Sequence, residues 1–124
     1  MKRIGFPVLL AVRAGGAGPA AAQGMAEMQF ERCRTCHSTD GTRRKEGPTL
    51  KGLFGRVSGS VDGFDYSPAM KDAKIVWTPE TLDRFLQRPA KMVPGTKMLF
   101  MGIRHPDDRA ALVEFLGKTL GTAK

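Results

Sequence analysis

The stretch Cys33-Arg34-Thr35-Cys36-His37 decides the fold of this 124-residue chain. Two cysteines three positions apart, followed directly by a histidine, form the pattern through which a c-type haem is attached covalently. Residues at i and i+3 share one face of a helix, so both thiols can reach the two vinyl groups of one porphyrin. His37 then lies beneath the ring and can offer a nitrogen to the iron.

Two other uses of a Cys-x-x-Cys pair fit the sequence less well. A thioredoxin-like dithiol site would want the pair beside a strand–helix–strand pattern, and the sequence shows no such alternation. A zinc site needs four ligands. The thiol and imidazole candidates are only Cys33, Cys36, His37 and His105. Adjacent Cys36 and His37 are poorly placed to share one small ion, so the pattern favours one haem c, attached through Cys33 and Cys36.

The first 22 residues have the composition of a cleaved secretory signal. A basic start precedes a mostly apolar run over residues 4–12, and three alanines at 20–22 suit a signal peptidase. Arg13 weakens this signal, and a short apolar N-terminal helix is the alternative. An uncleaved anchor is disfavoured because a bilayer span needs about 20 apolar residues. We predict a signal peptide over 1–22, one domain over 23–124, and a periplasmic location.

The chain is basic, with 20 Lys and Arg against 12 Asp and Glu. Loss of the signal would remove three basic residues and leave a net charge of about +5. Such an excess fits either a solvated surface or electrostatic steering toward an acidic partner. Nucleic acid is not expected as a partner, because the sequence has no recognition module and no basic patch interleaved with aromatic residues.

Apolar spacing and helix-start signals predict an all-α domain. One helix is expected over residues 25–34, leading into the haem motif, with Met28 and Phe30 in the core. Proline at the first helical position predicts three more helices, over 68–74, 79–88 and 106–120. Residues 38–59 and 90–102 are expected as loops. Loops this long in a small domain imply something large in the core.

A haem iron held by His37 needs a sixth ligand or an open site. The downstream candidates are His105, Met70, Met92, Met98 and Met101. A methionine usually fills a core gap, but Met98 follows the Pro- and Gly-containing loop 94–97, which can present its side chain edge-on. A thioether ligand raises the reduction potential. On the other face, the Pro48 carbonyl is a candidate acceptor for the second ring N–H of His37.

Together these stretches resemble the class I c-type cytochromes, and in layout mitochondrial cytochrome c and its soluble bacterial relatives. The matching stretches, in the family's order, are Cys33–His37, Gly47–Arg56, Trp77, Thr81-Leu82 and Pro94–Met98. They span residues 24 to 120. The resemblance implies the small cytochrome c fold, in which three to five helices and long loops wrap around one covalently bound haem.

The resemblance also implies roles for single residues. Cys33 and Cys36 would carry the thioethers. His37 and Met98 would be the axial ligands, and the Pro48 carbonyl would orient His37. A buried haem propionate would be surrounded by Arg56, Tyr66, Ser67, Trp77 and Thr96. The ring of Phe100 would shield the exposed haem edge, and Ala26 and Phe115 would lie where the first and last helices cross.

The sequence departs from the mitochondrial pattern at two positions near the haem. Phe85 stands where that pattern has a tyrosine whose hydroxyl reaches the methionine sulfur, and Met70 stands where it has a polar residue. We expect the missing hydroxyl to weaken the support of Met98, so that its loop opens more easily.

The resemblance implies a soluble one-electron carrier and not an enzyme. It would act as a monomer between membrane respiratory or photosynthetic complexes, with a quinol-oxidising cytochrome bc complex as donor and an oxidase, reaction centre or reductase as acceptor. A basic ring near the haem edge would guide docking on acidic surfaces of these partners, formed by Lys51, Lys91, Lys97, Arg34 and Arg88. The alternative is a haem peroxidase or ligand-binding haem module, if Met98 does not ligate.

Overall fold

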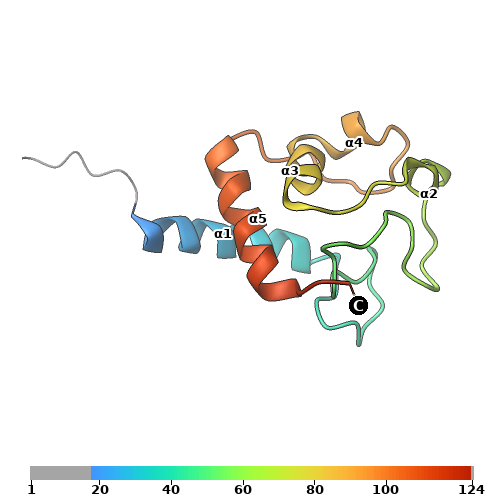
Figure 1. Ribbon diagram of the computed structural model, residues 1–124, viewed down its shortest axis with the longest axis horizontal. Coiled ribbons are helices and arrows are strands. Elements are labelled where there is room, and N and C mark those ends of the chain that lie inside the picture. The colour runs from blue at the N-terminus through green and yellow to red at the C-terminus, as the bar shows by residue number, and fades with distance from the viewer. Residues whose placement is uncertain (1–17, 124) are drawn as a thin grey trace, which may run out of the picture.

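The computed structural model describes residues 18–123, which form five helices joined by long loops (Figure 1). The helices are α1 (Pro19–Arg34), α2 (Pro68–Ala73), α3 (Pro79–Gln87), α4 (Pro89–Met92) and α5 (Pro106–Leu120). Within this range, extended pairing is limited to two isolated bridges, Phe54 with Thr122 and Val57 with Val76. The prediction of a small all-α fold is therefore confirmed.

Proline sets the start of every helix in the described range. Each of the five carries proline in its first turn, where the fixed φ angle suits the helix and the missing N–H has no partner to lose. Ser67 accepts a hydrogen bond from the amide of Met70 at the start of α2. Thr78 and Thr81 bond reciprocally at the start of α3 and form a capping box.

Two predicted boundaries are wrong. Helix α1 begins at Pro19 and not near residue 25, so it crosses the expected end of the signal peptide; residues 1–17 lie outside the described part of the chain. The expected loop over 90–102 opens with the single turn of α4. The physical reason is Pro89, which presets the first helical φ angle, and the turn closes through the amide of Val93 and the carbonyl of Pro89 at 2.9 Å.

The crossing of α1 and α5 is the largest contact between helices (Figure 1). Ala26 is 1% exposed there, because a small side chain lets the two helices approach closely. Four residues later, the ring of Phe30 packs edge-on against Phe115 with centroids 5.2 Å apart. The expected place of Ala26 and Phe115 agrees with this contact. The prediction that Met28 lies in the core is wrong. Its side chain is 66% exposed, since it lies on the other face of α1.

The long segment between α1 and α2 is ordered by backbone hydrogen bonds to distant parts of the chain. The amide of Gly52 donates to Leu120 at the end of α5. The amide of Gly55 donates to the carbonyl of Trp77 at 2.8 Å. The segment therefore forms a fixed wall opposite α3. None of the helices over residues 18–123 combines the length and apolar character that a membrane span requires.

The α1–α5 crossing gives a first testable prediction. Ala26→Leu should lower the free energy of unfolding by about 1–3 kcal/mol, because added methylenes overpack a buried contact. Gly24→Ala is the control on the same helix, since a methyl group at position 24 meets nothing within 4 Å; it should stabilise by up to about 1 kcal/mol. Urea unfolding of the haem-bearing protein measures both. Equal stability of the Ala26 variant and the parent protein would contradict the packing argument.

Candidate haem site

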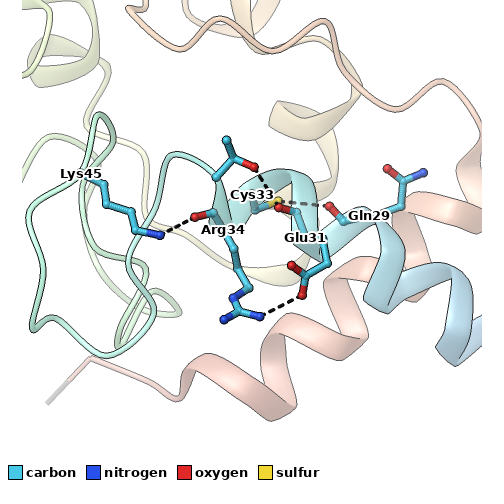
Figure 2. Close-up of polar contacts among 6 residues, drawn as sticks. Gln29, Glu31, Cys33, Arg34 and Lys45 are labelled. Carbon is cyan, nitrogen blue, oxygen red and sulfur yellow. Dashed lines mark hydrogen bonds and ion pairs between the residues drawn. The ribbon is translucent and has the colours of Figure 1, made fainter.

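The Cys-x-x-Cys-His stretch continues the last turn of α1. The amides of Cys36 and His37 both donate to the carbonyl of Cys33, at 3.1 and 2.9 Å. Both thiols are free and half-buried. Figure 2 shows the polar contacts that hold this turn: the thiol of Cys33 faces the Gln29 carbonyl at 3.7 Å, and the ammonium group of Lys45 reaches the Arg34 carbonyl at 2.6 Å. The turn thus presents two cysteine sulfurs and one imidazole together.

The imidazole of His37 is oriented by the backbone of Pro48. Its Nδ1 lies 2.7 Å from the Pro48 carbonyl oxygen. A carbonyl can only accept, so Nδ1 carries the proton and Nε2 keeps its lone pair free. Burial, opposed in part by this bond, lowers the pKa of His37, which favours the neutral ring that a metal requires. The predicted Pro48–His37 contact is therefore present, and its geometry suits an iron ligand.

Gly47 allows this contact, a role that was not predicted from the sequence. A Cβ atom at position 47 would lie 2.6 Å from Nδ1 and 2.9 Å from Nε2 of His37. The amide of Gly47 also donates to the Cys36 carbonyl at 2.7 Å. The loop therefore packs directly on the face of the imidazole. Only the adjacency of Gly47 and Pro48 in the sequence hinted at such a close approach.

A cavity of about 280 Å³ opens above the haem motif. Its lining includes all ten residues expected to bind the cofactor: Cys33, Cys36, His37, Pro48, Arg56, Tyr66, Trp77, Thr96, Met98 and Phe100. Leucines that were not predicted to bind the cofactor complete the apolar wall: Leu50, Leu53, Leu82, Leu86 and Leu116. The structure thus brings thiols, imidazole and thioether around one apolar space, as a covalently bound haem requires.

The polar part of the lining suits a carboxylate of the cofactor. Arg56, half-buried, donates to the Lys51 carbonyl at 3.1 Å, and no ion pair of residues 18–123 includes it. Burial lowers the pKa of Arg56 and raises that of Tyr66. The hydroxyl of Tyr66 accepts a hydrogen bond from the Val61 amide and remains free to donate. A half-buried guanidinium without a carboxylate fits an anionic group such as a haem propionate.

Met98 and two aromatic rings line the cavity from segments remote from the motif. Met98 is half-buried, and its amide donates to the Thr96 hydroxyl at 3.3 Å. Phe85, 5% exposed, packs on the indole of Trp77 with ring centroids 5.0 Å apart. The ring of Phe100 lies 4.8 Å from the guanidinium carbon of Arg32. The chain therefore offers a thioether to the same space that receives the imidazole of His37.

A second hollow, more open and about 790 Å³ in volume, lies between α3 and α5. Phe54 and Val113 contribute apolar surface to it, and Asp83 and Glu114 line its acidic side. Its lining contains no thiol, imidazole or thioether, so the haem-binding groups belong to the smaller cavity alone. Over residues 18–123, no group of three or more His, Cys, Asp or Glu side chains could hold a metal ion.

Known proteins match this chain over most of its length. The sequence model described as cytochrome c matches residues 21–119. The chain is 51% identical to cytochrome c 2.1 of Caenorhabditis elegans over 86 residues, which are 69% of this chain and 78% of that protein. It is 42% identical to cytochrome c2 of Blastochloris viridis over 110 residues, which are 86% of this chain and 87% of that protein.

The fold and the site define a small helical protein that holds one haem through two thioether bonds. The chain belongs to the cytochrome c family. Its cofactor is therefore haem c, attached at Cys33 and Cys36, and its general role is that of an electron carrier. The resemblance inferred from the sequence is confirmed.

The close approach of Gly47 to His37 can be tested by adding one methyl group. Gly47→Ala should destabilise the haem-bearing protein by about 1–3 kcal/mol, because the imidazole must move away from the new Cβ atom. Gly117→Ala is the control, since a Cβ there meets nothing within 4 Å. Urea unfolding measures the stability, and the paramagnetically shifted proton signals of His37 report its orientation. Unchanged signals in the Gly47 variant would count against the contact.

Proposed function

We propose that this protein is a periplasmic one-electron carrier whose haem c is ligated by His37 and Met98. The observation that carries the proposal is the common cavity. His37, with its Nδ1 engaged by Pro48, and Met98, from the loop after α4, both line it. The bound haem supplies an iron that changes oxidation state by one electron. The chain supplies ligands that keep this iron closed to other molecules.

Each group of the site has a proposed part in this function. The Pro48 carbonyl holds His37 in one tautomer and makes the ring a better donor to a metal. The thioether of Met98 favours the reduced state and so raises the potential. The buried propionate is held by Arg56, Tyr66, Ser67, Trp77 and Thr96, all of which line the cavity. Phe100, half-buried beside Arg32, covers the edge of the haem.

The proposal predicts a near-infrared band from the bond between oxidised iron and sulfur in the parent protein. Met98→Ala should abolish that band and lower the reduction potential by on the order of 100 mV, within the roughly 0.8 V that axial ligands span. Met101→Ala is the matched control, because Met101 is 90% exposed and should leave both unchanged. Optical spectra and redox titration measure these quantities. A high-spin parent protein without the band would instead favour a haem peroxidase or a ligand-binding haem module.

The proposed partners are membrane electron-transfer complexes with acidic docking surfaces: a quinol-oxidising cytochrome bc complex as donor, and an oxidase, reaction centre or reductase as acceptor. The five basic residues expected near the haem edge are all exposed. Two of them are paired, Lys97 with Asp65 and Arg34 with Glu31. Lys51, Lys91 and Arg88 take part in no ion pair of the described residues, so they offer the stronger field for docking.

Steering by these charges should depend strongly on salt. The rate of electron transfer to an isolated membrane oxidase should fall by roughly tenfold or more from about 0.01 to 0.15 M ionic strength, because the Debye length shrinks from about 30 to 8 Å. Lys91→Gln should lower the low-salt rate. Lys118→Gln is the control, since Lys118 is paired with Glu114 on α5. A rate that stays flat across this range would rule out electrostatic docking.

The proposed location and oligomeric state rest on the sequence. A basic and then apolar start, followed by three alanines at 20–22, supports export to the periplasm. The relative from Blastochloris viridis, which matches 86% of this chain, supports a carrier of the same kind. The exposed surface is rich in charge, which favours a monomer that meets each partner transiently.

A further inference from the structure

Arg109 is a buried charge that the proposed electron-transfer site does not use. It lies in the first turns of α5 and is 6% exposed. In the described range, the other buried polar residues are three serines, so Arg109 is the one buried charged side chain there. A guanidinium taken out of water costs free energy unless all its partners are in place. The acceptors that Arg109 contacts therefore indicate what this residue does.

All three acceptors of Arg109 lie outside α5. Its Nε donates to Asp83 Oδ1 on α3 at 3.1 Å. Its Nη1 donates to the backbone carbonyls of Ile103 and Arg104, at 2.8 and 2.9 Å. The guanidinium thus joins α5, α3 and the end of the loop that carries Met98. Charge-assisted bonds of this kind are about twice as strong as neutral ones.

The segment that Arg109 grips also packs on the end of α3. The amide of Ile103 donates to the Leu86 carbonyl at 2.8 Å. Gly102 has a φ of +106°, and a Cβ atom there would clash with the Gln87 carbonyl and lie 3.1 Å from that of Leu86. Residues 102–104 therefore form a fixed anchor four residues after Met98. In Figure 1 the chain leaves α4, turns and runs back past α3 to the start of α5.

Between this anchor and α4, few backbone hydrogen bonds hold the chain. We call residues 97–101 the Met98 strap. Within the described residues 18–123, the backbone of the strap forms no hydrogen bond to any other backbone group outside the helices. Leu99 and Met101 within it are 100% and 90% exposed. On the other side, Val93 is 3% exposed and forms the upstream anchor. Apart from side-chain contacts such as Lys97 with Asp65 and Phe100 with Arg32, the strap is therefore fixed at its two ends.

We propose that Arg109, fixed by Asp83, is a positioning residue that latches the downstream end of the Met98 strap and so controls how readily Met98 leaves the iron. The inference rests on the proposed ligation by Met98. Opening the latch releases the carbonyls of Ile103 and Arg104, which frees the anchor and lets the strap move outward. The α1–α5 crossing, formed around Ala26 and Phe30, stays in place.

Two variants of the haem-bearing protein open the latch without emptying the core. Arg109→Lys keeps the charge and loses the three-bond geometry. Asp83→Asn keeps an acceptor oxygen and removes its charge. With saturating imidazole as the probe, the rate of Met98 displacement from oxidised iron should rise by roughly ten- to a hundredfold in Arg109→Lys, and less in Asp83→Asn. Glu114→Gln, which breaks an exposed ion pair on the same helix, should leave the rate unchanged.

Amide hydrogen exchange separates a local latch from a general loss of stability. Arg109→Lys should raise the exchange rate of the Ile103 amide relative to the parent protein. The rise should be larger than at the amide of Trp77, which bonds Arg56 elsewhere in the fold. Equal factors at the two amides, or none, would overturn the latch. A selective effect at Ile103 with an unchanged imidazole rate would overturn its control of Met98. A parent protein lacking the near-infrared band would refute the proposed function, and the exchange data would still decide whether the latch exists.

Discussion

The hydrogen bond from Nδ1 of His37 to the Pro48 carbonyl, 2.7 Å long, is the contact on which the site depends. It joins the end of α1 to the long loop and decides where the free Nε2 points. Gly47 makes it possible, because any larger residue would meet the ring. Burial keeps the imidazole neutral by lowering its pKa. A haem attached at Cys33 and Cys36 would meet this fixed ring on one side, and Met98 would approach it from the same cavity if it ligates as proposed.

The hydrophobic core of this protein surrounds a cavity, so the cofactor is part of the core. Leu53, Leu82 and Leu116 are each 5% exposed or less, and all three also line the cavity. Apolar side chains that face such a space lose the contacts that a bound porphyrin restores. The loops owe their order to the same arrangement, since the wall opposite α3 is held by backbone bonds to Trp77 and Leu120. A haem that fills this cavity would therefore stabilise the fold through contacts with these side chains.

The sequence indicated which residues share one cavity more completely than it indicated where the helices begin and end. All ten expected cofactor residues line one cavity, because their roles were tied to chemistry and to a family pattern that fixes their order. Besides the start of α1 and the role of Gly47, three features were not predicted. Met28 shares an apolar spacing with Phe30 but lies on the exposed face of α1, since a short periodic pattern does not show which face meets α5. The single turn of α4 depends on Pro89. The burial of Arg109 depends on acceptors 5 to 26 residues away, which no local pattern reveals.

The two ion pairs near the Met98 strap differ in a way that separates docking from ligation. Lys97 and Asp65 form a pair with side chains 57% and 90% exposed; such surface pairs contribute about 0–1 kcal/mol and are screened by salt. A partner that approaches the haem edge can compete for Lys97 at little cost. Arg109 and Asp83 form a pair whose guanidinium side chain is 8% exposed while the carboxylate side chain is 38% exposed, so salt should screen this pair less than the surface pair. In the proposed function, a docked partner would therefore compete for the charge of Lys97 while the bonds of Arg109 to Ile103 and Arg104 stay in place.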